Sequence, residues 1–242
     1  MRKKISLFNL DVEVQIGVSK RANKRQAPVH TAAASDIKLN FGPGPNWVKP
    51  DDSWYSIDID PAIGDVVVNF QEFAGLPFED ASVSCVYGSH VFEHISIFNA
   101  RPVFKEIYRV LNKGGIFRLV LPDAEKSISE YVRGNAGFLL FSRRRERAKK
   151  QYGIEYTLFE CLREDFLSPS GQTSLLGKNM LAHQNAWDFT TIKADLERAG
   201  FDAEHIFRSG FRQSRSEHFS FEGTFPSEAN EDYRSLYVEA VK

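Results

Sequence analysis

Two glycines and an aspartate form the first group of residues that could bind a ligand. Gly42 and Gly44 follow an apolar run that ends at Phe41, and glycine lets a backbone turn sharply and approach a ligand without a Cβ in the way. Asp58 stands at the end of the next apolar run, where a carboxylate can accept both hydroxyls of a ribose. The group indicates a nucleoside-containing cofactor, with a purely structural turn as the alternative.

Residue 47 separates two classes of such cofactors. In the dinucleotide fingerprint, a third glycine permits a helix to pack closely on a strand beside a pyrophosphate. In the stretch GPGPNW, Trp47 occupies that position. We therefore expect a cofactor without a pyrophosphate, which favours S-adenosylmethionine over NAD(P).

His90, Glu93 and His94 match H-x-x-E-H, a pattern that places two zinc-binding histidines and a glutamate base on one helix of some peptidases. Here the pattern begins directly after a predicted strand, and the sequence shows no third ligand beside it. We therefore expect no metal site, and we interpret Glu93 and His94 as residues that cap and orient the loop.

A second cluster of charged residues lies further along the chain. Six basic residues fall within eight positions, at Arg143, Arg144, Arg145, Arg147, Lys149 and Lys150. Such a run is typical of a solvated helix face. A clamp for the phosphate of a nucleotide-linked sugar, a lipid-linked acceptor or RNA is the functional alternative, with RNA the least favoured because aromatic residues are sparse there.

The elements that must position these residues follow from the apolar pattern. Helical spacing across 104–111 and 189–196, with stops at Gly114–Gly115 and Gly200, predicts two amphipathic helices. Apolar runs bounded by turn signals predict strands at 37–41, 54–59, 66–70, 81–88, 115–121, 203–207 and 235–241. This alternation predicts an α/β fold, a Rossmann-like and mostly parallel sheet with helices on both faces.

Two features modify this simple picture. Few residues separate the first three strands, so the helices there must be shortened, and an antiparallel hairpin of 54–59 with 66–70 stays open. Residues 1–36 show no strong period, and we interpret them as a leader that wraps the domain at 37–242. The stretch 124–182 interrupts the alternation and is expected to be an insertion over the sheet edge that carries the active site.

The composition excludes several classes of protein. The chain has 242 residues, with 31 basic and 32 acidic side chains, so no global field favours nucleic acid or an anionic membrane. No apolar stretch reaches the length of a membrane span. The two cysteines, Cys85 and Cys161, do not suggest a disulfide framework, so we expect a cytoplasmic protein.

Four segments, LNFGPGPN, WYSIDIDP, LPFEDASVSCVYGSHVFEHI and EIYRVLNKGGIFRLVLPD, resemble the class I S-adenosylmethionine-dependent methyltransferases of bacterial carbohydrate and secondary-metabolite gene clusters. The resemblance covers 37–123. It implies S-adenosylmethionine as the cofactor and a set of residues that line it, namely Phe41, Gly42, Gly44, Asp58, Ile59, Asn69, Phe70, Gly88, Ser89 and His90. Asn69 departs from the family, which often has an aspartate facing the adenine, but an amide oxygen can also accept a hydrogen bond.

Methyl transfer to a hydroxyl also needs a base within hydrogen-bond reach. The resemblance points to the segment around His183, where the insertion rejoins the domain, as facing the acceptor, and Trp187 could wall the same pocket. His90 is the competing base, and the alternative is that His183 caps the following helix while Trp187 is core. We therefore expect a methyltransferase acting on a hydroxyl of a small molecule or carbohydrate. Amine or carboxyl methylation, a non-catalytic cofactor-binding module and an NAD(P)-binding protein are the alternatives.

Overall fold

The computed structural model describes residues 2–7, 10–15, 36–167, 183–219, 221, 228 and 232–242. At the N-terminus, β1 (Arg2–Leu7) and β2 (Leu10–Gln15) pair as an antiparallel sheet of two strands. The sequence pattern did not predict this hairpin. The wrapping leader expected at 1–36 stays a prediction, since most of it lies outside the described residues.

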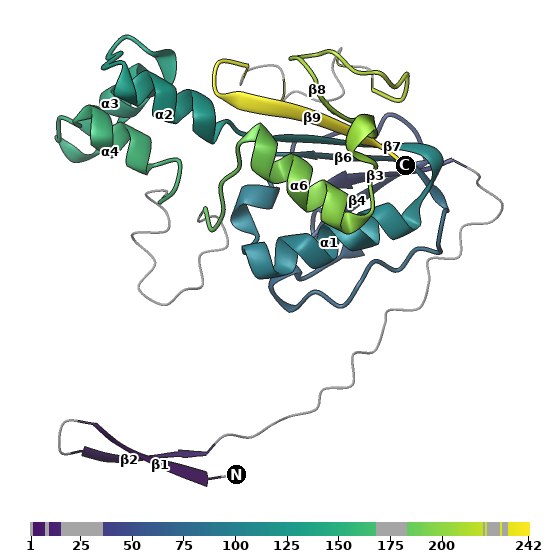
Figure 1. The fold of residues 1–242 in the computed structure, drawn as a ribbon, viewed down its shortest axis with the longest axis horizontal. Helices are drawn as coiled ribbons and strands as arrows, with labels where there is room; N and C mark the ends of the chain where they lie inside the picture. Colours follow the sequence, from purple (N-terminus) through teal and green to yellow (C-terminus); the bar gives the residue numbers. More distant parts are fainter. Residues whose placement is uncertain are drawn as a thin grey trace.

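The main sheet has seven strands in the order β5-β4-β3-β6-β7-β9-β8 (Figure 1). The first five run parallel, and β9 runs antiparallel to β7 and β8. The strands are β3 (Ile37–Phe41), β4 (Trp54–Asp58), β5 (Val66–Val67), β6 (Val83–Ser89), β7 (Leu111–Pro122), β8 (Ile206–Arg208) and β9 (Ser235–Val241). The predicted mostly parallel Rossmann-like sheet is thus confirmed.

The connection from β4 to β5 excludes the antiparallel hairpin, because the two strands pair in parallel, Ile57 with Val66. A tight turn at Asp60 reverses the chain without a helix, and Asp65 then braces the turn by accepting hydrogen bonds from the backbone and hydroxyl of Ser56 at 2.7 and 2.6 Å. The predicted strand at 66–70 ends early because Asn69 caps a 3-10 turn, η1 (Phe70–Glu72).

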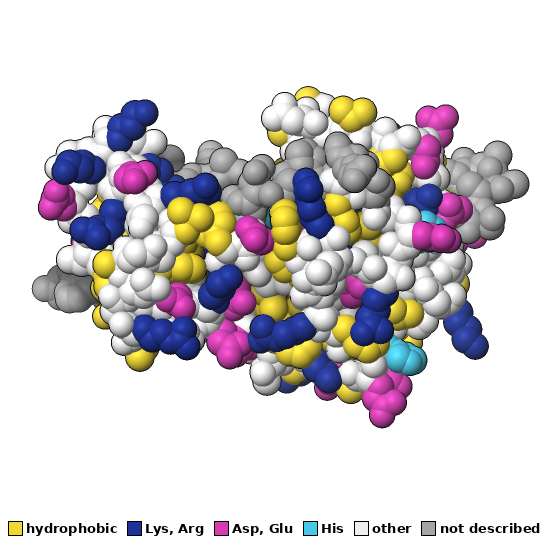
Figure 2. Space-filling view, turned by 90° about the horizontal axis from the view of Figure 1, so that it is seen from above, with side chains coloured by type: hydrophobic (Ala, Val, Ile, Leu, Met, Phe, Trp, Pro, Cys, Tyr) yellow, Lys and Arg dark blue, Asp and Glu magenta, His cyan; other side chains and the backbone are white. Residues whose placement is uncertain are grey.

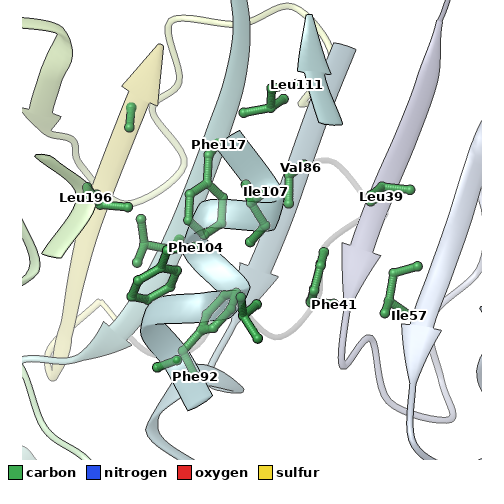
Figure 3. Packing of buried hydrophobic residues seen from close by; sticks show 14 of the residues in the cluster. Leu39, Phe41, Ile57, Val86, Phe92, Phe104, Ile107, Leu111, Phe117 and Leu196 are labelled. Carbon is green, nitrogen blue, oxygen red and sulfur yellow. The ribbon is translucent and has the colours of Figure 1, made fainter. Parts of the chain in front are cut away.

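Two helices, α1 (Ile97–Val110) and α6 (Phe189–Ala199), cover one face of the sheet. Figure 3 shows Phe104 and Ile107 of α1 among strand residues such as Val86 and Phe117. The predicted stop of α1 at Gly114–Gly115 is wrong, because the helix ends at Val110 and the glycines form an irregularity within β7.

The opposite face of the sheet has a different cover. Its buried residues Trp54, Tyr87 and Tyr237 pack with Phe219, which comes from a loop. Helices were expected on both faces, but the part of the chain between β3 and β4 forms turns instead of a helix. The predicted strand at 203–207 is likewise displaced, since η3 (Ala203–His205) precedes β8.

The expected insertion contains α2 (Ala124–Val132), α3 (Leu139–Tyr152) and α4 (Leu158–Arg163), and begins directly after β7 (Figure 1). It has a small core of its own, formed by Leu140, Phe141, Cys161 and Leu162. A 3-10 turn, η2 (Phe92–His94), follows β6. Among the described helices, none is long and apolar enough to cross a bilayer.

Candidate active site

The candidate site lies where the strand order reverses, between β3 and β6. From these two neighbours the sheet grows outward in opposite directions, and open α/β sheets bind ligands beyond the carboxyl ends of strands at such a switch point. Phe41 of β3 pairs with Gly88 of β6. The sequence-predicted Gly42, Ser89 and His90 therefore follow side by side at this edge.

The two glycines of the turn are required for different reasons. Gly42 has a φ of +55°, and a Cβ added to it would lie 2.6 Å from Cγ2 of Val91. Gly44 has a φ of +74°, but a Cβ there would meet no atom within 4 Å. Gly42 thus serves both the turn and the close approach of the loop after β6, whereas Gly44 serves the turn alone.

Asp58 and Asn69 both hold backbone turns. Oδ1 of Asp58 accepts a hydrogen bond from the backbone amide of Asp60 at 2.9 Å, and Oδ1 of Asn69 accepts one from Gln71 at 3.0 Å. Each oxygen has a further lone pair for a ligand. Oδ1 of Asp58 therefore holds the turn, as the structural interpretation expected. The carboxylate keeps further lone pairs, so this contact is also compatible with a role in binding a ribose.

Two of the predicted cofactor residues have side chains that face the core. Phe41 is fully buried and its ring stacks on Phe70, with the ring centroids 5.8 Å apart. At these two positions only the backbone is placed to meet a ligand. Ile59, directly after β4, is half-buried.

His90 connects the loop after β6 to β9. Its Nδ1 lies 3.2 Å from Oε1 of Glu93 and its Nε2 lies 2.9 Å from Oγ of Ser235. Its φ of 52° is in the left-handed region, a strain that is common at functional sites. Since a carboxylate oxygen only accepts, Nδ1 donates and the ring is held in one orientation.

Glu93 is the buried centre of this loop, with an exposed fraction of 1%. Burial raises the pKa of its carboxyl, but the hydrogen bond from His90 and the neighbouring histidines outweigh burial and keep that pKa below its usual value. Its backbone carbonyl accepts hydrogen bonds from Gln184 and Asn185 at 2.7 and 3.1 Å. The expectation that Glu93 orients the loop is consistent with these contacts.

The hydrogen bonds from Gln184 and Asn185 to Glu93 also bring His183 beside the loop after β6. Its ring stands edge-on to that of His94, with centroids 5.0 Å apart, and its Nδ1 lies 2.9 Å from the carbonyl oxygen of Asp165. Burial lowers the pKa of the His183 imidazole. His183 does not cap the following helix, because Asp188 caps α6 by accepting from Thr191.

Trp187 does not wall a pocket. It is 1% exposed, belongs to the main core, and donates from Nε1 to Oδ2 of Asp195 at 3.1 Å. Asp195 also accepts from Arg101 and Arg198. The hypothesis of a pocket wall is wrong, and the interpretation of Trp187 as core is confirmed.

The comparison with known families agrees with this geometry. A sequence model of the methyltransferase domain matches residues 55–119, from β4 to the middle of β7. The match covers less than half of the chain, and it marks this part as similar to a methyltransferase domain. No curated protein sequence matches the chain.

Several solved structures are similar to this chain at low identity. One is an S-adenosylmethionine-dependent methyltransferase from Archaeoglobus fulgidus, at 12% identity and a TM-score of 0.44, with 86% of each chain covered. Another is from Mesorhizobium loti, at 12% identity and a TM-score of 0.40, with 85% of this chain and 90% of that chain covered. A phosphoethanolamine N-methyltransferase from Haemonchus contortus, in complex with S-adenosyl-L-methionine, has 13% identity and a TM-score of 0.40, with 88% and 50% covered.

The edge between β3 and β6 fits S-adenosylmethionine, the cofactor that the sequence resemblance implies. Gly88, like Gly42, permits no side chain, because an added Cβ would lie 2.6 Å from Phe92. A Trp at position 47 in place of a third glycine remains consistent with a cofactor that has no pyrophosphate.

The six basic residues between positions 143 and 150 form neither a purely solvated helix face nor an open site for a phosphate. Arg144 is buried and pairs with Asp165 and Glu164, and Arg147 also pairs with Glu164. Lys149 pairs with Glu155 on the surface. Figure 2 shows Lys and Arg side chains spread over the lobe that the insertion forms, interspersed with acidic and apolar ones. Two of the six basic residues thus hold α3 to α4.

The grouping of Glu93, His94 and His183 is the feature that sequence reasoning missed. Ligand atoms of the three lie within 4.8 Å of one another. The H-x-x-E-H pattern contained two of them, and the third ligand it lacked comes from the end of the insertion. The useful signal was a single histidine at the point where the insertion rejoins the domain, for which the sequence suggested a base or a helix cap but not a metal ligand.

Proposed function

We propose that this protein transfers a methyl group to a hydroxyl of a small molecule or carbohydrate. The observation that carries the proposal is the set of imidazoles around buried Glu93, in the loop after β6 whose Val91 lies against the glycine turn at Gly42. A hydroxyl must lose its proton during transfer, whereas an amine needs only to arrive deprotonated. A site that concentrates imidazoles beside the methyl donor suits the hydroxyl.

We further propose which residues hold the cofactor. Gly42 and Gly44 would approach its methionine part by their backbone, and Asp58 would accept hydrogen bonds from its ribose through carboxylate lone pairs that Asp60 does not use. The adenine would lie near Asn69. The remaining contacts would come from the backbone of Phe41, Ile59, Phe70, Gly88, Ser89 and His90.

The cofactor supplies a methyl group on a positively charged sulfur, which the acceptor oxygen displaces in line. The protein must hold that oxygen in line, exclude water and receive its proton. His90 is locked between Glu93 and Ser235, so it can take a proton only if the bond to Ser235 is exchanged. Nδ1 of His183 donates to Asp165, so the lone pair of its ring is on Nε2, and we propose His183 as the group that receives the proton.

The test is a panel of hydroxyl, amine and carboxyl acceptors, with release of S-adenosylhomocysteine as the readout. We expect release with hydroxyl acceptors, and strongly reduced turnover for His183→Ala with cofactor affinity intact. His205→Ala is the matched control, since His205 is exposed on η3, and should behave as the wild type. Release with amines alone, or equal rates for His183→Ala and His205→Ala across the pH range, would refute the proposal.

A further inference from the structure

Glu93, His94 and His183 converge from two distant segments of the chain, the loop after β6 and the segment before α6. Each offers one ligand atom, and these atoms lie within 4.8 Å of one another. Two imidazoles and one carboxylate form a donor set that proteins use for zinc and other transition metals, with positions left open for water or substrate.

An unsatisfied oxygen of Glu93 points to an ion independently of this grouping. Oε1 of Glu93 lies near His90, but the buried Oε2 has no hydrogen-bond partner among the described residues. Leaving a buried polar atom unpaired costs about 1–3 kcal/mol and more for a charged group, so such an atom in a native structure needs an explanation. A cation bound to the carboxylate would satisfy it.

The contacts around the three residues also resemble the outer shell of a metal site. A histidine that binds a metal usually donates its other ring N–H to a backbone carbonyl or a carboxylate, which fixes the ring and leaves the second nitrogen for the metal. Nδ1 of His183 lies 2.9 Å from the carbonyl oxygen of Asp165, an acceptor only, so Nε2 carries the lone pair. The carboxylate of Glu93 is likewise oriented by the hydrogen bond from His90.

We propose that Glu93, His94 and His183 bind a divalent transition-metal ion of the Zn²⁺, Mn²⁺ or Co²⁺ type. The two imidazoles favour these ions over Mg²⁺, which prefers oxygen ligands. Three protein ligands leave at least one coordination position open. The ion can enter because the side chains of both histidines are partly exposed.

The place of the ion gives it a role that rests on the proposed hydroxyl methylation. Val91, two residues before Glu93, contacts the glycine turn at Gly42, so the ion would be bound by the same loop that lines the cofactor edge. An acceptor hydroxyl in the open position would have its pKa lowered by the ion. It could then release its proton to solvent water, and its oxygen would displace the methyl group from the cofactor's sulfur, which leaves as a neutral thioether. His183 then acts as a ligand, and the metal takes over the activation of the hydroxyl.

The experiment uses the full chain after removal of metal with a chelator. Zn²⁺ and Mn²⁺ are titrated by calorimetry and Co²⁺ by its visible absorption, with Mg²⁺ as the comparison ion. We expect one ion per chain for at least one transition metal, and binding at least about tenfold weaker in His94→Ala, His183→Ala and Glu93→Gln. His205→Ala should bind as the wild type. Circular dichroism verifies that each variant is folded, and Glu93→Gln keeps the size of the buried side chain.

Two results would overturn the site. One is the absence of binding by the wild type at about 1 mM of each transition metal, a concentration at which even weak sites are occupied. The other is equal affinity in His183→Ala and His205→Ala. Metal binding combined with turnover that is unchanged by the chelator would keep the site and refute its role in the reaction. Full metal binding with no release from any hydroxyl acceptor would instead refute the proposed function.

Discussion

Replacing Gly42 by alanine tests how the glycine turn is built against the loop after β6. The backbone at Gly42 has a φ of +55°, and an L residue there costs about 1–2 kcal/mol because its Cβ crowds the backbone. The new Cβ would also lie 2.6 Å from Cγ2 of Val91, and overpacking of this kind costs about 1–3 kcal/mol. We therefore expect Gly42→Ala to lower the free energy of unfolding by about 2–5 kcal/mol.

Two further variants separate the backbone cost from the steric cost. Gly44→Ala places an alanine at a φ of +74° with no atom within 4 Å of the new Cβ, so it should cost only about 1–2 kcal/mol. Val91→Ala removes the methyl group with which the new Cβ at position 42 would clash. In the Val91→Ala background the closest remaining contact is with Cβ of residue 91 at 3.0 Å, so Gly42→Ala should cost clearly less than it does in the wild type.

The assay is urea unfolding followed by tryptophan fluorescence and circular dichroism, with equal m-values as the sign of a common two-state transition. Calorimetry with S-adenosylmethionine should show weaker binding for Gly42→Ala than for Gly44→Ala, because the displaced loop carries Ser89 and His90. Equal losses of stability in the two glycine variants, or no relief from Val91→Ala, would refute the reasoning.

Asp58→Ala should weaken S-adenosylmethionine binding by about 1–3 kcal/mol in calorimetry, as expected for a charged hydrogen-bond acceptor; an unchanged Kd with an intact circular dichroism spectrum would leave Asp58 a turn residue only. Buried Asp195 accepts hydrogen bonds from the Trp187 indole and from two arginines. Asp195→Ala should thus lower the free energy of unfolding by about 2–4 kcal/mol in urea, and a loss within about 0.5 kcal/mol of zero, typical of neutral surface changes, would contradict this. The hydrogen bonds at the start of α6 lower the pKa of Asp188, so its stabilising effect is present above the ordinary carboxyl pKa and is lost as the pH falls through the lowered value. Asp188→Ala should cost about 1 kcal/mol at neutral pH and progressively less in strong acid, whereas Asp188→Asn should keep most of the cap, and a cost of Asp188→Ala that does not change with pH would contradict the titration.

The sequence alone was sufficient for the central strands of the main sheet and for the glycine turn, and it indicated a class of cofactor. These depend on short-range patterns, namely apolar runs of strand length, a turn that only glycine allows at Gly42, and an aspartate at the end of the next strand. The shortened connections after the first strands were predictable in the same way, because the chain there is too short for a helix. The direction of β5 was not, because it depends on the turn at Asp60 and the bonds between Asp65 and Ser56.

Only the tertiary structure decided which distant residues meet. His183 reaches Glu93 and His94 because the backbone amides of Gln184 and Asn185 bond to the carbonyl of Glu93, and no local pattern encodes a contact across so many residues. Arg144 is buried for the same reason, since its partner Asp165 lies beyond α4, and Trp187 is core because it packs against Phe104 of α1. Periodicity in a sequence reports which face of an element is apolar, but the pairing of polar groups depends on how the elements pack against one another.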